Sequence, residues 1–227
     1  MKVLLVNGSP NKKGSTNRVL EEMIKVFNQN EIDTEIFWLG NEPICGCIGC
    51  GVCNKSGKCF IDDKANEFLK IAKDVDGFVF ATPVHFSSMS GFMKPFLDRV
   101  FFGKKNSIFR LKVAATICCA RRGGSSSALD DLNKYPLFAN MILVGSNYWN
   151  MVYGKNKDDI EKDLEGLQTA RVLASNMTYV LKTINCGKKN NIEIDSLENK
   201  IYTNFIFWCI TVCLSILILT KNIIMIK

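Results

Sequence analysis

Histidine is almost absent from this sequence, which contains only His85. One imidazole cannot build a histidine metal site, and a histidine without a partner is more often a packing residue than a general acid or base. The sequence also offers no catalytic triad and no convincing acid–base pair. Reactions that depend on such side chains are therefore not expected.

Two nucleotide-binding motifs are missing as well. No Gly-Lys-Ser/Thr stands at the spacing of a Walker A loop, and the loop after the first apolar run contains no G-x-G-x-x-G. A cradle for a pyrophosphate group is therefore not indicated.

A signal-peptide core and a coherent basic surface are also lacking. Only residues 3–6 form an apolar run before Asn7, which is too short for secretion. A chain of 227 residues can bury a core without disulfide staples, so we expect a cytoplasmic protein without a disulfide framework. The net charge of +7 comes from basic residues scattered in pairs, so no nucleic-acid partner is expected.

Apolar periodicity predicts one α/β domain over residues 1–200, followed by a hydrophobic segment. Short apolar runs predict strands, and apolar stripes at helical spacing predict helices. Their alternation favours a parallel sheet wrapped by helices, with ligands bound at the carboxyl ends of the strands. The predicted strands are 2–6, 32–39, 77–81, 112–118 and 140–144, and the predicted helices are 16–28, 62–72, 90–101 and 158–181.

Three loops that follow predicted strands are rich in small or polar residues. Residues 8–17 offer hydroxyls, an amide and backbone N–H groups at a helix start, which suit a single phosphate dianion. An ordinary loop with an N-cap serine has the same composition. Residues 82–90 suit the edge of a flat ring, and residues 120–125 bring cations and glycines to the same end of the sheet.

The stretches NGSPNKKGSTN, ATPVHFSSMSGFMKPFLDR and ARRGG resemble the three flavin-contacting segments of the NADPH-dependent FMN reductase family. The resemblance covers about residues 2–185 and implies a flavodoxin-like fold, a doubly wound five-stranded parallel sheet in the order 2-1-3-4-5. Lys94, Asp98 and Arg99 match a family signature and are interpreted as structural, because they lie beyond the loop on the following helix. The residues implied to bind FMN are Ser9, Lys12, Ser15, Thr16 and Asn17 around the phosphate, Pro83, Val84, His85, Phe86 and Ser87 along the isoalloxazine ring, and Arg121, Gly123 and Gly124 nearby.

The resemblance implies an oxidoreductase that takes electrons from NAD(P)H or a reduced carrier and passes them through FMN to a small-molecule or protein acceptor. FMN carries hydride and one-electron chemistry itself, so the protein need only hold the phosphate, cover one ring face and leave N5 open. FAD is less expected, because no pyrophosphate loop is present. Two alternatives stay open, a flavin-binding electron carrier or redox sensor without turnover, and a nucleotide-binding regulatory domain.

Five of the ten cysteines lie in the stretch CGCIGCGVCNKSGKC, residues 45–59. Cys47, Cys50, Cys53 and Cys59 have C-x2-C-x2-C-x5-C spacing, which is short enough to wrap one centre, and Cys45 is interpreted as a spare thiol. With the Asp62–Asp63 pair that follows, the block resembles the iron–sulfur flavoprotein branch of the family. That branch implies a [4Fe–4S] cluster as a one-electron relay. The glycines that allow the loop to turn with positive φ are Gly46, Gly49, Gly51 and Gly57.

Two other interpretations of the cysteine block remain open, a zinc site and metal-free redox thiols. The block follows the second predicted strand, which is an outer strand in a flavodoxin-like order. A cluster there would need a second subunit to approach the flavin, and a homodimer or homotetramer is expected.

The final hydrophobic segment, residues 201–221, includes an uncharged run over 201–220. At about 1.5 Å per residue this run has a length of roughly 30 Å, the thickness of a bilayer core. It is interpreted as a membrane anchor, as a core element of an obligate dimer, or as an extension of a domain that stops near Asn204. Lys200 precedes the uncharged run and Lys221 follows it, so the charges at its two ends give little indication of its orientation in a membrane.

Overall fold

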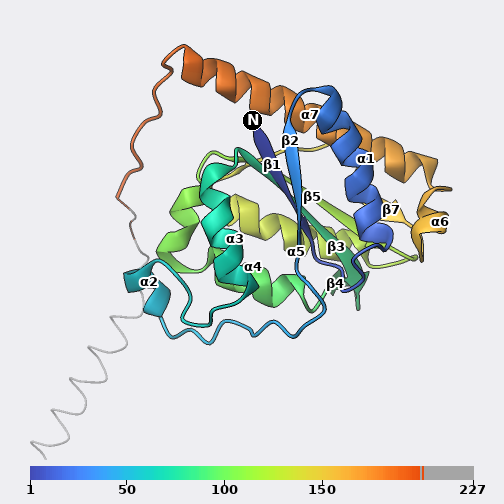
Figure 1. The fold of residues 1–227 in the computed structure, drawn as a ribbon, viewed down its shortest axis with the longest axis horizontal. Coiled ribbons are helices and arrows are strands. Elements are labelled where there is room, and N and C mark those ends of the chain that lie inside the picture. The colour runs from blue at the N-terminus through green and yellow to red at the C-terminus, as the bar shows by residue number, and fades with distance from the viewer. Residues whose placement is uncertain (200, 202–227) are drawn as a thin grey trace, which may run out of the picture. The chain divides into compact units, whose positions relative to one another are not determined.

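The computed structural model describes residues 1–199 and 201, with the side chains of 104–106 left out. Met1–Asn190 form one compact unit of alternating strands and helices (Figure 1). The strands are β1 (Lys2–Asn7), β2 (Asp33–Trp38), β3 (Gly77–His85), β4 (Ser88–Met89), β5 (Val113–Ala120), β6 (Ile142–Leu143) and β7 (Met151–Tyr153). The helices are α1 (Ser15–Gln29), α2 (Val52–Ser56), α3 (Lys64–Ile71), α4 (Met93–Phe101), α5 (Ser125–Phe138), α6 (Lys157–Ile160) and α7 (Leu164–Lys189), with 3-10 turns η1 (Ala72–Asp74) and η2 (Gly103–Phe109).

The main sheet has the order β2-β1-β3-β5-β6, and all of these strands pair in parallel. This confirms the predicted 2-1-3-4-5 order and the flavodoxin-like fold. The fifth strand is interrupted, because β6 and β7 both pair with β5 at different heights and are separated by residues 144–150. β4 turns back on the end of β3 as a short antiparallel hairpin.

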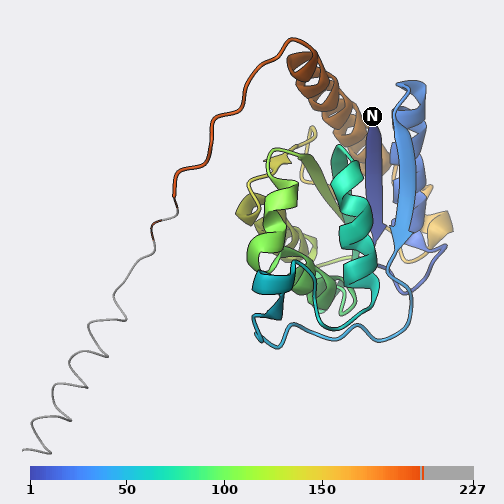
Figure 2. The same cartoon turned by 60° about the vertical axis from the view of Figure 1, so that its left-hand side comes forward.

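Both faces of the sheet are buried, because side chains alternate along each strand. On β1, Val3 and Leu5 join the core beneath α1 and α7, whereas Leu4 and Val6 join the opposite core. That second core lies beneath α3 and α4 and is rich in phenylalanine, with Phe68 and Phe96 in edge-to-face contact at a centroid distance of 5.2 Å. Figure 2 shows α1 and α3 on opposite sides of β1.

The short elements α2, β4 and α6 were not predicted, and three longer elements also differ from the sequence prediction. Helix α5 was not predicted, because its three serines and Pro136 hide a weak apolar stripe. The strand predicted at 140–144 is present only as the short strand β6. After residues 144–150, β7 pairs with the far end of β5. The helix predicted at 158–181 begins later, because Asp163 accepts a hydrogen bond from the Gly166 N–H at 3.0 Å and caps α7 at that point.

The predicted membrane anchor, residues 201–221, lies outside the described residues except for Ile201. In the part of the chain that the structure describes, no helix has both the length and the apolar character needed to cross a bilayer.

A buried charge network joins α1 to α6 and α7. Arg18 and Glu22 are both nearly buried and pair at 2.9 Å, and Arg18 also bonds both carboxylate oxygens of Glu161. Glu22 accepts further hydrogen bonds from Lys25 and Arg171. Burial alone would raise the pKa of Glu22, but these hydrogen bonds outweigh it and lower the pKa to about 2. Ionised Glu22 therefore stabilises the folded chain.

Glu22→Gln should lower the free energy of unfolding by about 2–3 kcal/mol near neutral pH. A carboxylate with a depressed pKa contributes its stability above the unfolded value of about 4.5 and loses it as pH falls towards 2. The gap between wild type and variant should therefore close between about pH 5 and pH 2 in urea-unfolding measurements.

Glu35→Gln is the matched control, because Glu35 pairs with Lys2 on the surface with both side chains partly exposed. It should change stability by less than about 1 kcal/mol. A Glu22→Gln deficit that stays constant from neutral to acid pH would contradict the assigned role.

Candidate functional site

The first predicted loop is fixed to the end of β3 by backbone and hydroxyl hydrogen bonds. The Gly8 N–H donates to the Ala81 carbonyl at 2.8 Å, and the Ser90 hydroxyl donates to the Gly8 carbonyl at 2.6 Å. Ser90 is itself held by Thr82, whose hydroxyl accepts from the Ser90 N–H at 3.0 Å. The loops after β1 and β3 are therefore joined at the carboxyl edge of the sheet.

Helix α1 begins at this edge without a side-chain cap. Gly14 is its N-cap, so the first N–H groups of the helix have no side-chain acceptor. The Thr16 side chain is buried and its hydroxyl makes no hydrogen bond of ordinary geometry among the described residues, although it lies close enough to the Cys119 thiol to lower the pKa of that thiol against the effect of burial. An orphaned buried hydroxyl beside open N–H groups at a helix start suits an anion such as a phosphate.

The second loop forms a tight hairpin between β3 and β4. Phe86 and Ser87 at its tip both have positive φ, 49° and 59°, and Phe86 is fully exposed. Gly124 allows the hairpin to pack closely, because a Cβ there would lie 2.7 Å from the Ser87 Cα. A bulky residue held in the left-handed region and exposed to solvent is a strained feature of the kind found at functional sites.

The three loops and a fourth segment enclose a cleft of about 580 Å³. This volume lies within the range of small-molecule sites, about 300–1,000 Å³. Three cations beyond the predicted set, Lys13, Lys155 and Lys157, line it and suit an anionic ligand. The lining residues from the predicted loops are Ser9, Pro10, Asn11, Lys13, Gly14, Ser15, Thr16, Pro83, Val84, His85 and Arg121, and the fourth segment is 154–158.

Six predicted FMN residues do not line this cleft. Lys12 instead lies over the Trp38 ring at 5.4 Å, and the Asn17 amide donates to Glu21 at 2.7 Å. Phe86 points into solvent. The others are Ser87 and Gly124, which meet at the hairpin contact, and Gly123 beside them in the chain. For these six, as for the seven predicted residues that line the cleft, the FMN-binding role stays a prediction.

Cys119 forms part of the cleft lining from the end of β5. Burial raises the pKa of its thiol, and burial also raises the pKa of Cys118 to about 12. Both cysteines therefore remain neutral thiols near physiological pH. A neutral thiol is neither a nucleophile nor a metal ligand, because both roles need the thiolate.

The predicted metal-binding cysteines gather around a second, smaller cavity of about 20 Å³. Cys47, Cys50, Cys53 and Cys59 all line it, whereas Cys45 does not. Cys47 and Cys50 are exposed, Cys53 is buried and Cys59 is half-buried. Arg99 of α4 and Phe102, which follows that helix, also line the cavity.

The glycines of this loop behave largely as predicted. Gly51 begins α2 and Gly57 ends it, with φ of 70° and 72°. Gly49 also has positive φ, whereas Gly46 does not, so the loop uses this conformational freedom at three of the four glycines.

The inner cysteines are anchored to the protein core. The Cys59 N–H donates to Asn66 Oδ1 at 2.9 Å, and Asn66 Nδ2 donates to the Cys59 carbonyl at 2.8 Å. Arg99 Nε donates to Cys59 Sγ at 3.4 Å. Cys53 packs against Gly103, where a Cβ would lie 3.3 Å from the Cys53 sulfur. Two of the four sulfurs thus have fixed surroundings.

Arg99 is the most buried charged residue of this region and pairs with Asp63 through both carboxylate oxygens. Burial alone would lower the pKa of Arg99, but the hydrogen bonds with Asp63 and Cys59 raise it. The interpretation of Arg99 as structural was therefore incomplete, because its guanidinium faces the cysteine cavity. Lys94 and Asp98 pair with each other on the same helix, and Tyr135 donates to Asp98 at 2.5 Å.

Eight cysteines of the described residues are free thiols, so no disulfide framework is formed there. Within the same residues, no group of three or more His, Cys, Asp or Glu side chains is arranged to hold a metal ion. The four cysteines therefore share a cavity without converging on one point.

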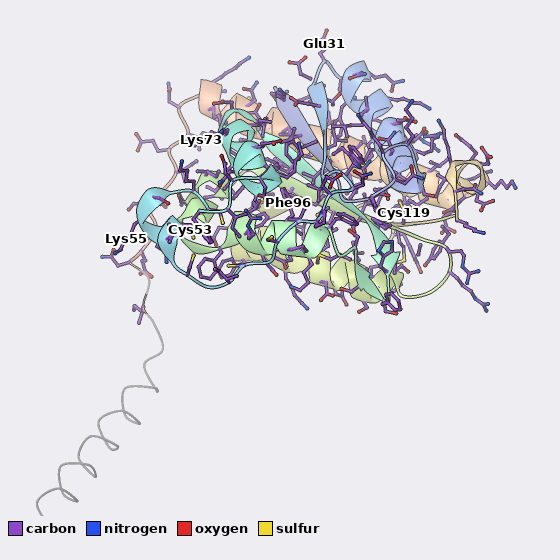
Figure 3. All side chains as sticks on the ribbon, turned by 60° about the horizontal axis from the view of Figure 1, so that its bottom comes forward. Glu31, Cys53, Lys55, Lys73, Phe96 and Cys119 are labelled. Carbon is purple, nitrogen blue, oxygen red and sulfur yellow. The ribbon has the colours of Figure 1, made fainter. Side chains whose placement is uncertain are left out.

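The cleft and the cysteine cavity are separate, because no residue lines both. Figure 3 labels Cys53 in the cysteine region and Cys119 in the cleft, with Phe96 of the core between them. Sequence reasoning missed the 154–158 segment, Asn66 and Gly103, and only their tertiary placement identifies them. For 154–158, the pair of lysines at 155 and 157 was the sole available signal.

Comparisons with known proteins agree with this geometry. The model of the family described as NADPH-dependent FMN reductase matches residues 1–156. An iron-sulfur flavoprotein of Methanocaldococcus jannaschii is 33% identical over 191 residues, covering 81% of this chain and 99% of that protein. An iron-sulfur flavoprotein of Clostridioides difficile is 29% identical over 168 residues, covering 73% of each.

Solved structures share the fold at low sequence identity. RosB with bound 8-demethyl-8-formylriboflavin-5'-phosphate has a TM-score of 0.65 at 14% identity, covering 90% of this chain and 92% of that one. The flavoenzyme NAD(P)H:(acceptor) oxidoreductase FerB of Paracoccus denitrificans has a TM-score of 0.58 at 14% identity, covering 80% and 97%. The family match and the relatives together establish the class: the chain belongs to the NADPH-dependent FMN reductase family and is a flavin oxidoreductase.

Proposed function

We propose that this protein takes electrons from NAD(P)H or a reduced carrier through FMN and exchanges them singly with an external partner by way of a [4Fe–4S] cluster. When bound, FMN supplies hydride and one-electron transfer, and the cluster supplies a one-electron relay. The observation that carries the proposal is that one chain combines a phosphate-suited cleft with four cysteines around one anchored cavity.

The phosphate end of the cleft fits FMN by its donors. The open N–H groups of α1 and the Thr16 hydroxyl would bond the phosphate oxygens, and the nearby Ser15 hydroxyl would add a donor. Lys13 and Arg121 would offset the charge of the dianion. In this proposal Pro83 to His85 lie along the ring, and the neutral thiol of Cys119 keeps the adjoining floor apolar.

The four cysteines suit a cluster better than a single zinc ion, but the cavity must open before a cluster can enter. A zinc site needs four sulfurs within about 2.3 Å of one point, whereas a cluster spreads its thiolates over four irons. The cavity of about 20 Å³ holds little more than a water molecule, so loading requires the exposed part that carries Cys47 and Cys50 to move outward. Cys53 and Cys59, which the core anchors, would stay in place.

A second copy of the chain is the partner that this proposal requires. No residue lines both the cleft and the cysteine cavity, and Figure 3 shows Cys53 of the cavity and Cys119 of the cleft apart in its view. Electron exchange between FMN and cluster is then most direct across a subunit interface. The assembly would be a homodimer or homotetramer.

Turnover is tested by mixing purified, FMN-loaded protein with NADH or NADPH without oxygen. Bleaching of the flavin band, followed by reoxidation with a one-electron acceptor such as ferricyanide, is the expected result. If neither nicotinamide nor a reduced ferredoxin bleaches the flavin, the protein is a flavin-binding sensor rather than a reductase.

Thr16→Val should weaken FMN binding about tenfold to a hundredfold, because a hydrogen bond to a charged group contributes about 1.5–3 kcal/mol. Apoprotein stability should not fall, since the variant removes a buried hydroxyl that has no partner among the described residues. Flavin fluorescence titration measures the first effect, and urea unfolding measures the second.

Thr178→Val is the matched control, because Thr178 on α7 also buries a hydroxyl without a partner in the described residues but does not line the cleft. FMN affinity should be unchanged in this variant. Equal affinity in wild type, Thr16→Val and Thr178→Val would exclude Thr16 from the phosphate site.

Anaerobic reconstitution with iron and sulfide should load close to four irons per chain. Cys50→Ala should lose the cluster and keep FMN, because Cys50 lies at the cavity and away from the cleft. Cys45→Ala should keep both, since Cys45 does not line the cavity. Iron and sulfide analysis with flavin absorbance measures these outcomes, and wild-type protein without iron would leave a flavin reductase with free thiols.

A further inference from the structure

Arg99 uses every N–H donor of its guanidinium on the two ends of the cysteine loop. Nε donates to Cys59 Sγ at 3.4 Å. Nη1 donates to the Cys45 carbonyl at 3.3 Å and to Asp63, and Nη2 donates to the Ile61 carbonyl at 2.8 Å and to Asp63 at 2.7 Å. These are the five donors that an arginine has, so the side chain has one defined orientation.

The position of the Arg99–Asp63 pair is unusual for an ion pair with only a structural role. Arg99 is 1% exposed, and a buried ion pair contributes little net stability because desolvation offsets the attraction. Asp63 would satisfy the charge by itself through two parallel hydrogen bonds. The Nε donor is nevertheless directed at a sulfur that the proposed function makes a metal ligand.

We infer that Arg99 is a positioning residue for Cys59, and that the Arg99–Asp63 pair sets the reduction potential of the cluster. This inference rests on the proposed [4Fe–4S] site. Hydrogen bonds to ligand sulfurs and nearby charge both shift cluster potentials. A cation that donates to Cys59 Sγ favours the reduced cluster, which carries one more negative charge.

The two partners predict shifts of opposite sign. Arg99→Gln removes the cation and leaves the Asp63 carboxylate beside the cluster, so the potential should fall. Asp63→Asn removes the carboxylate and keeps the Arg99 cation, so the potential should rise. Asn also caps helices well, so Asp63→Asn should preserve the cap that Asp63 makes with the Ala65 N–H.

Redox titration of anaerobically reconstituted protein, followed by EPR of the reduced cluster, measures these shifts. Each single variant should change the reduction equilibrium constant by about tenfold or more, which is about 59 mV for one electron. The double variant Arg99→Gln/Asp63→Asn removes both charges and should lie between them. It also retains the fold if the unpaired carboxylate makes Arg99→Gln unstable.

Asp98→Asn on α4 is the matched control, because it neutralises a carboxylate whose partners are Lys94 and Tyr135. Its cluster potential should equal that of the wild type. The flavin potential should be the same in all these proteins, since none of the substituted residues lines the cleft.

The outcomes separate this inference from the proposed function. Wild-type protein that takes up no iron overturns the proposed cluster, and the inference with it. A loaded wild type with shifts of the same sign, or with no shift, in Arg99→Gln and Asp63→Asn overturns the inference alone. If every Arg99 variant fails to load, Asp63→Asn decides, because an unchanged potential in that variant contradicts the inference.

Discussion

The parallel pairing of β1 with β3 is the constraint on which the cleft at the carboxyl edge of the sheet depends. It brings Gly8 against Ala81, so that the loops after the two strands leave the sheet side by side and the Ser90 hydroxyl can tie them together. Helix α1 then starts at this edge with open N–H groups. The chain after β2 leaves the sheet at the same edge, because β2 is parallel to β1, and the cysteine loop that follows is held by Asn66 of α3 and Arg99 of α4. The sheet order thus fixes the cleft, whereas contacts with α3 and α4 fix the thiol-rich cavity.

Buried strands and the order of the sheet could be predicted, because β1 and β3 are apolar on both faces and the loop motifs resemble one family. Features that depend on tertiary contacts could not be predicted. The interruption between β6 and β7 depends on pairing with β5, and α5 carries Pro136 where a helix pattern would be read as ended. The spacing of the four cysteines was enough to predict that they lie together. Asn66 could not be predicted as part of this region, because only its two hydrogen bonds with the Cys59 backbone place it there.

In the loop of residues 8–17, single side chains show the same difference between what the sequence predicts and what tertiary contacts decide. From the sequence, Thr16 and Lys12 are equally good candidates for binding the phosphate, since both lie in a loop that suits an anion. The structure directs them differently, because β2 places Trp38 beside the loop, where its indole N–H donates to the Ser9 carbonyl at 2.7 Å and its ring lies under Lys12. Loop composition therefore indicates the ligand class, and the neighbouring strand decides which side chains remain for it.

The cysteine loop combines a rigid half with an exposed half, and this division has a physical reason. Cys59 is held through its backbone by Asn66 and through its sulfur by Arg99, while Cys47 and Cys50 are open to solvent. Four thiolates fixed close together would repel one another in the empty protein, whereas two anchored sulfurs and two exposed ones avoid that cost. The anchored side also carries the cation, so negative charge that gathers at the site meets a compensating guanidinium already in place. A loop of this kind can open on its exposed side to admit a metal group while the anchored half and the core stay in place.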